Sequence, residues 1–257
     1  MFIASHYLLT LLPLLVLAIT GWLISLKSNN VTIVDTVLGM FFLTSTVFGF
    51  LLFGLSSLRA CLVLTLVALW SSRLSIYLHI RNHNKPEDSR YRAIRERNEP
   101  NFRMKSVYLV FVLQAILAWI LSIPLHVSIQ SEVALNIFDY IGIALWIIGM
   151  FFQVIGDFQL AKFKSNPKNK GKVLADGVWR YTRHPNYFGE SCIWFGYGFI
   201  GIATGAWWVI ISPMLMTYLL VKVTGAALLE SDISDRRPAY KSYIKSTNRF
   251  IPWFPKS

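Results

Sequence analysis

A dense string of polar and aromatic residues stands where a charged loop meets an apolar segment. It reads Arg-Tyr-Thr-Arg-His-Pro-Asn-Tyr-Phe-Gly-Glu at 180–190. Guanidinium, imidazole, amide and carboxylate groups are costly at the mouth of a bilayer unless they bind something or pair with each other. Such a mixture of charged donors and acceptors can hold an anionic or hydrogen-bonding ligand. The candidate binding residues of this string are Arg180, Tyr181, Arg183, His184, Asn186, Tyr187 and Glu190.

A second polar set lies earlier in the chain. Gln153, Asp157 and Lys164 are spaced by four and seven residues, which places them on one face of a helix. An acid beside a basic cluster can hold a polar ligand, so Asp157 is a candidate binding residue. Arg73 and Tyr77, in an earlier apolar segment, share a helix face in the same way.

Long apolar blocks must position these groups. The chain of 257 residues is 54% hydrophobic and only 15% charged. A run of about 18 or more apolar residues is typical of a transmembrane helix, because a rise of about 1.5 Å per residue requires about 20 residues to cross the hydrocarbon. The sequence therefore predicts an all-α polytopic membrane protein with seven helices, roughly at 5–26, 31–55, 58–80, 106–128, 136–158, 187–205 and 206–228.

The net charge of +12 is explained by topology. Lys and Arg cluster at 81–105, 162–183 and 236–256, and cytoplasmic segments are the ones enriched in these residues. Seven spans put all three clusters in the cytoplasm, with the N-terminus outside and the C-terminus inside. The basic surplus thus does not indicate a nucleic-acid partner.

The sequence predicts a single membrane domain over residues 1–257. The loops 81–105 and 161–186 and the tail 230–257 form its cytoplasmic cap. Cys61 and Cys192 fall in separate predicted spans, where cysteines usually only pack, and no zinc-binding spacing is present, so we expect no metal. The first span lacks a basic leader and a cleavage site, which favours a retained helix over a signal peptide.

Two stretches of the C-terminal half carry a family resemblance. They are Gly156-Asp-Phe-Gln-Leu-Ala-Lys-Phe-Lys164 and Gly171-Lys-Val-Leu-Ala-Asp-Gly-Val-Trp-Arg-Tyr-Thr-Arg-His-Pro-Asn-Tyr-Phe-Gly-Glu190. Both resemble the steroid 5-alpha-reductase-like superfamily, and within it the DUF1295 branch. The segment from Arg90 to Arg95 and the tail from Arg236 to Pro255 are similar to that branch as well.

The resemblance implies an NADPH-dependent reductase of seven helices, with the cofactor in a cavity that faces the cytoplasm. By position, Gln153 and Asp157 correspond to family residues that hydrogen-bond the cofactor. Asn186 corresponds to the asparagine near the nicotinamide. The substrate implied is a lipid-like enone, such as a steroid, taken from the bilayer.

The same resemblance implies where the phosphates and the adenosine are held. Lys164 and Lys172 correspond to family arginines at the phosphates, and Asp232 and Arg236 to a polar pair at the adenosine end. NADPH carries a pyrophosphate and a 2′-phosphate, so it requires several cations. Lys164, Lys172, Arg180, Arg183 and Arg236 supply them.

The expected reaction moves a hydride to the β-carbon of the enone, while charge grows on the carbonyl oxygen. A hydrogen-bond donor near that oxygen stabilises the developing enolate. Tyr77 aligns with the family's catalytic tyrosine. The family's Gln-Glu pair in the second span is missing, and Asp35 is the acid of that span, so Asp35 is the candidate replacement.

Two other classes of protein share parts of this pattern. Isoprenylcysteine carboxyl and phospholipid methyltransferases have a similar Arg-His-Pro-x-Tyr-x-Gly string but bind S-adenosylmethionine, which has no phosphates. They carry a Glu-Glu pair after the last span, which Glu230-Ser-Asp232 only approximates. A transporter explains the spans but not the polar cluster.

The expected location is an integral, multi-pass position in a membrane. We expect the inner membrane in a bacterium, or the endoplasmic reticulum in a eukaryote. Membrane lipids are the expected surroundings, and the sequence predicts no oligomeric state.

Overall fold

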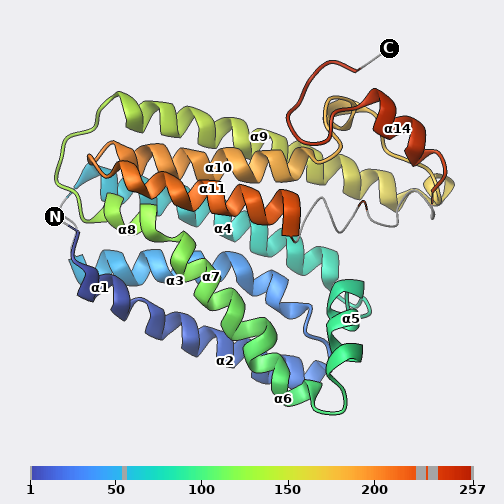
Figure 1. The fold of residues 1–257 in the computed structure, drawn as a ribbon, viewed down its shortest axis with the longest axis horizontal. Coiled ribbons are helices and arrows are strands. Elements are labelled where there is room, and N and C mark those ends of the chain that lie inside the picture. Colours follow the sequence, from blue (N-terminus) through green and yellow to red (C-terminus); the bar gives the residue numbers. More distant parts are fainter. Residues whose placement is uncertain (1, 54–56, 224–229, 231–236, 256–257) are drawn as a thin grey trace. The chain divides into compact units, whose positions relative to one another are not determined.

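The computed structural model describes residues 2–53, 57–223, 230 and 237–255. Over these residues the chain forms helices and connecting turns and no strand, which confirms the all-α fold class. The chain divides into two compact units, Met1–Leu135 and Asn136–Ser257 (Figure 1). The single membrane domain expected from the sequence stays a prediction.

The first unit is built around α3, which packs against α2, α4 and α7. A π-helical segment, η1, precedes α7 in the same helical stretch. The helices of this unit are α1 (Ala4–Leu9), α2 (Leu11–Ser28), α3 (Ile33–Phe53), α4 (Leu58–Asn82), α5 (Ser89–Asn98), α6 (Phe102–Ser106), η1 (Val107–Val112), α7 (Leu113–Leu121) and α8 (Ile123–Ile129).

The second unit is built around two long helices, α9 and α10, which run side by side (Figure 1). Asn136 caps α9 with its side chain, and Asp139 completes a capping box. The helices of this unit are α9 (Ile137–Ser165), η2 (Pro167–Asn169), η3 (Gly177–Arg180), α10 (Pro185–Ile202), η4 (Trp207–Ile210), α11 (Ile211–Tyr218), η5 (Leu219–Val223) and α14 (Tyr240–Ser246).

Among the described residues, five helices are long and apolar enough to cross a membrane, which supports an integral membrane protein. They are Ala4–Ser28, Ile33–Phe53, Leu58–Asn82, Phe102–Leu121 and Ile137–Ser165. The predicted count of seven is not confirmed within the described residues. The span expected at 187–205 is α10, in which polar residues and glycines dilute the apolar ones, and the last one is the shorter apolar helix Trp207–Val223.

Glycines at intervals of seven residues let α9 and α10 approach closely. A Cβ atom on Gly149 would lie 2.5 Å from the carbonyl oxygen of Gly189, and one on Gly142 would lie 2.6 Å from the carbonyl oxygen of Gly196. Small residues at a helix interface allow this backbone contact, which van der Waals packing stabilises inside a membrane. This helix pair supports the polar residues described below.

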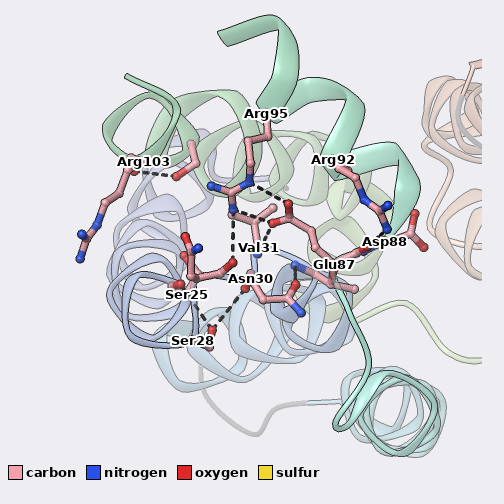
Figure 2. A network of polar contacts seen from close by, with 12 residues as sticks. Ser25, Ser28, Asn30, Val31, Glu87, Asp88, Arg92, Arg95 and Arg103 are labelled. Atoms are coloured by element: carbon pink, nitrogen blue, oxygen red, sulfur yellow. Dashed lines mark hydrogen bonds and ion pairs between the residues drawn. The ribbon is translucent and has the colours of Figure 1, made fainter. Parts of the chain in front are cut away.

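The charged segment between α4 and α6 is folded onto the turn between α2 and α3. Glu87 accepts hydrogen bonds from the backbone N–H of Val31 at 3.0 Å and from the Arg95 guanidinium at 2.8 Å (Figure 2). The N–H of Asp88 donates to the Thr32 hydroxyl at 2.9 Å. Burial raises the pKa of Glu87, but the contacts with Arg95 and Val31 outweigh it and lower that pKa. The segment is therefore held in one conformation by charge-assisted bonds.

Candidate functional site

The polar string is divided by the start of α10. His184 is the N-cap residue and Pro185 occupies the first turn, where proline's fixed φ and missing N–H suit a helix start. Arg180 therefore ends the short helix η3, residues 181–184 form a loop, and residues 185–190 form the first turns of α10. Asn186 and Glu190 are four residues apart and share a face of α10.

That face of α10 meets the polar face of α9. The Asn186 side-chain amide donates to the Asp157 carboxylate at 3.4 Å, and the Gln153 amide donates to the Glu190 carboxylate. Gln153 and Asp157 are almost fully buried, at 3% and 4% exposure. The structure thus brings together four of the residues that the sequence assigned to a cofactor.

Glu190 and Asn186 are each held by a further contact. The indole N–H of Trp194 donates to Glu190 at 2.9 Å, and the backbone N–H of Tyr187 donates to the side-chain oxygen Oδ1 of Asn186 at 3.1 Å. The Tyr187 ring stacks on His184 with centroids 5.6 Å apart. The polar cluster is therefore positioned by its own helix as well as by α9.

Arg183 and His184 are bonded to a carboxylate from the other end of this unit. The Arg183 Nε donates to Glu230 at 2.7 Å, His184 Nε2 lies 3.0 Å from the same carboxylate, and Tyr240 donates to it at 3.2 Å. Arg183 also donates to the carbonyl oxygens of Thr247 and Ile244. Its guanidinium is 8% exposed, so here it serves as a clasp between the loop and the tail. Its expected role at a cofactor phosphate stays a prediction.

The Glu230 clasp predicts a specific acid sensitivity. Burial raises the pKa of Glu230, but the hydrogen bonds from His184 and Arg183 outweigh burial and lower the pKa from 4.5 to about 2. A lowered pKa means that the stabilisation is fully present above the unfolded value and is lost as pH falls from about 4.5 to about 2. Unfolding temperatures measured against pH should converge for the wild type and Glu230→Gln as this window is crossed. If the difference between the two unfolding temperatures stays constant across this window, the ionised Glu230 carboxylate does not stabilise the fold.

The C-terminal tail is fastened to the same loop by its backbone. The N–H of Trp253 donates to the carbonyl oxygen of Tyr181 at 3.0 Å. The Thr182 hydroxyl donates to the carbonyl oxygen of Phe250 at 2.8 Å. Tyr243 donates to the carbonyl oxygen of Trp179. These bonds join the tail to residues 179–182, at the beginning of the polar string.

The candidate phosphate ligands lie on the last turn of α9 and on the segment that follows it. Lys164, Lys172 and Arg180 are exposed, and Arg237 donates to the carbonyl oxygen of Lys172 at 2.9 Å. Lys162, Lys168 and Lys170 add positive charge to the same segment. Asp232 and Arg236 lie outside the described residues.

The candidate catalytic residues are in the first unit and are connected through Arg81. The Tyr77 ring lies beside two guanidinium groups, 5.2 Å from Arg73 and 5.9 Å from Arg81. Arg81 also forms an ion pair with Asp35 at 3.7 Å. The structure therefore places Asp35 and Tyr77 in contact with the same arginine.

Asp35 is the centre of an ion-pair network. It is 7% exposed and accepts hydrogen bonds from the Tyr91 hydroxyl at 2.5 Å and from Arg90 at 2.9 Å. Gln114 donates to the same Tyr91 hydroxyl at 3.1 Å. Two guanidinium groups and a phenol hydroxyl therefore surround this carboxylate. This favours a positioning role for Asp35, and its catalytic role stays a prediction.

Two residues of these networks were not assigned to the site from the sequence. Arg81 follows Tyr77 by four residues, as Tyr77 follows Arg73, so the shared face was visible in the spacing. Glu230 is 47 positions from Arg183, and no local pattern connects the two. Only the fold reveals that contact.

Comparison with known proteins gives the chain a family. The model of the DUF1295 family, described as a protein of unknown function, matches residues 21–247. An uncharacterised protein of Schizosaccharomyces pombe is 23% identical over 269 residues, covering 90% of this chain and 75% of its own length. The bovine 3-oxo-5-alpha-steroid 4-dehydrogenase 1 is 32% identical over 66 residues, about a quarter (26%) of each chain.

No solved structure matches the chain significantly. The bovine relative suggests an oxidoreductase of the reductase-like membrane class, and the family match extends over most of the chain. The chain belongs to the DUF1295 family, and part of it is similar to a steroid 4-dehydrogenase.

Proposed function

We propose that this protein is an NADPH-dependent membrane reductase that saturates a conjugated carbon-carbon double bond of a lipid-like enone. The observation that carries the proposal is the buried contact of Asp157 with Asn186 beside that of Gln153 with Glu190. Two acids and two amides between apolar helices are costly unless they hold a ligand or one another. The bovine relative's name supports a 3-oxo-steroid or a similar enone.

The donor set of the described residues fits this cofactor. Amides and carboxylates such as Asn186 and Asp157 suit the nicotinamide carboxamide and the ribose hydroxyls, which are neutral. The bond between these two side chains is long, at 3.4 Å, so exchanging it for a ligand contact costs little. The exposed lysines at 162–172 begin five residues after Asp157 and suit the phosphates.

Each group then has a distinct task. When bound, NADPH would supply a hydride to the β-carbon of the enone, and the resulting enolate would take up a solvent-derived proton at its α-carbon, so that the substrate gains two hydrogens. The Tyr77 hydroxyl donates a hydrogen bond to the carbonyl oxygen, on which negative charge grows. Arg73 and Arg81 beside the Tyr77 ring favour that charge, and Asp35 holds Arg81 in place. The apolar helices exclude water from the reaction.

The proposal is tested by product analysis. Purified protein in lipid nanodiscs receives NADPH and a 3-oxo-4-ene steroid, and mass spectrometry follows the gain of two hydrogens by the steroid. A panel that adds a polyprenoid enone and a fatty enoyl compound identifies the substrate class. If no enone of the panel is reduced and NADPH is not consumed, the proposed reaction is wrong.

Tyr77→Phe separates chemistry from binding. The substitution removes the hydroxyl and keeps the ring beside its two arginines, so we expect cofactor binding to be retained. Loss of the hydrogen bond to the developing enolate should slow turnover by about 100-fold or more. Single-turnover rates and a cofactor titration on the same sample provide the measurement. Turnover equal to that of the wild type would remove Tyr77 from the mechanism.

A further inference from the structure

The lipid-facing side of α9 defines the level at which the bilayer ends. Large apolar side chains are exposed along it from Ile137 to Phe158, and Phe158 is 62% exposed. These 21 steps at about 1.5 Å each span about 32 Å, which matches a hydrocarbon thickness of about 30 Å. Charged side chains on the exposed surface begin at Lys162. The interface therefore lies close to Phe158.

The loop that follows α9 returns to this same level. The Trp179 indole donates to the carbonyl oxygen of Gly156 at 3.1 Å, and the N–H of Val178 donates to the Gln159 side chain at 3.1 Å. Both acceptors are within two residues of Phe158. The helix η3, which contains Trp179 and ends at Arg180, is thus fixed at the membrane interface.

A groove separates η3 from the exposed side of α9. It has a volume of about 450 Å³. Its lining is mostly apolar, and Arg180, Tyr181 and Gln159 contribute the polar side chains. Of the described residues that line it, Arg180 alone is charged. The lining residues are Phe151, Phe152, Ile155, Gln159, Gly177, Val178, Arg180 and Tyr181.

The tail places more aromatic side chains beside this groove. The backbone of Trp253 is bonded to Tyr181, and Phe254 contacts the Tyr181 ring with centroids 6.2 Å apart. Even so, the side chains of Trp253 and Phe254 are 66% and 73% exposed. Aromatic residues with this exposure gather where lipid headgroups meet the hydrocarbon.

We propose that this groove binds one acidic phospholipid. Its acyl chain lies along Phe151 and Ile155, and its phosphate is paired with Arg180, with Trp253 and Phe254 at the surrounding headgroup level. The positive charge of Arg180 favours an anionic lipid, because the lipid phosphate complements the guanidinium. Phe151, which lines the groove, is also exposed on the lipid-facing side of α9.

Native mass spectrometry of the detergent-solubilised protein tests this, with phosphatidylglycerol and phosphatidylcholine as probes and no cofactor added. The wild type should retain more phosphatidylglycerol than phosphatidylcholine. Arg180→Gln should weaken this retention about fivefold, which corresponds to about 1 kcal/mol for one basic residue at an anionic surface. Arg97→Gln, an equal change of charge at an exposed arginine of α5, should leave it unchanged.

A second variant tests the acyl chain. Ile155→Phe adds apolar volume to the groove and introduces no polar group, so it should lower retention while the protein stays folded. Equal retention of the two lipids by the wild type would overturn the proposal. So would an Arg180→Gln protein that behaves as Arg97→Gln does, or glycerol phosphate binding as tightly as the phospholipid.

Discussion

Asp157→Ala and Asn186→Ala are each expected to abolish the thermal stabilisation of the protein by NADPH. Asp157 is buried and charged, and the Asn186 amide is its partner on α10. Removing a hydrogen bond that involves a charged group costs about 1.5–3 kcal/mol, so cofactor affinity should fall by at least about tenfold. The measurement is the unfolding temperature as a function of NADPH concentration, which reports binding to the folded state.

Cys192→Ala is the matched control for these two variants. Cys192 lies on α10 and is buried, and it is not one of the residues proposed to contact the cofactor. We expect its NADPH stabilisation to equal that of the wild type. If Asp157→Ala and Asn186→Ala also keep the full stabilisation, these residues do not hold the cofactor.

Gly149→Leu is expected to be the most destabilising single change in the second unit. Its Cβ alone would lie 2.5 Å from the carbonyl oxygen of Gly189 and 2.7 Å from Ile193. Overpacking costs about 1–3 kcal/mol where side chains can move, and here the nearest atom is backbone, so α9 and α10 must separate. The unfolding temperature in detergent, measured without cofactor, should fall sharply.

The neighbouring residue provides the comparison. Ile148 is 45% exposed on the lipid-facing side, so Ile148→Leu changes no helix contact. Its unfolding temperature should match that of the wild type. Equal unfolding temperatures for Gly149→Leu and Ile148→Leu would contradict the close packing of the two helices.

The helical fold and much of the polar cluster could be predicted from the sequence, because the signals are local. Apolar runs identify spans, and the spacing of Gln153 and Asp157 places both on one face of α9. The proline after His184 marks the start of α10. The number of spans could not be predicted as well, since α10 mixes glycines and polar residues with its apolar ones.

Contacts between distant segments could not be predicted. The sequence assigned Arg183 to a phosphate, whereas the fold bonds it to Glu230 and to the backbone of the tail. Asp35 was assigned to catalysis, and the fold surrounds it with Arg90 and Tyr91. In each case the partner lies on another element, so only packing decides which of several cations meets which acid.

The close packing of α9 and α10 could be predicted only in part, from the spacing of their glycines. Gly142, Gly149 and Gly156 recur every seven residues, and so do Gly189 and Gly196. This period indicates a helix face of small residues but does not name the partner helix. The structure shows that the partner helix is α10, because Gly149 packs against the backbone of Gly189.

The central claim is that the polar cluster of α9 and α10 binds NADPH. One thermal-shift experiment tests it most directly: purified protein is heated with NADPH, NADH or S-adenosylmethionine in parallel. We predict stabilisation by NADPH, a smaller effect of NADH because it lacks the 2′-phosphate, and none by S-adenosylmethionine. Stabilisation by S-adenosylmethionine alone would contradict the account and favour a membrane methyltransferase.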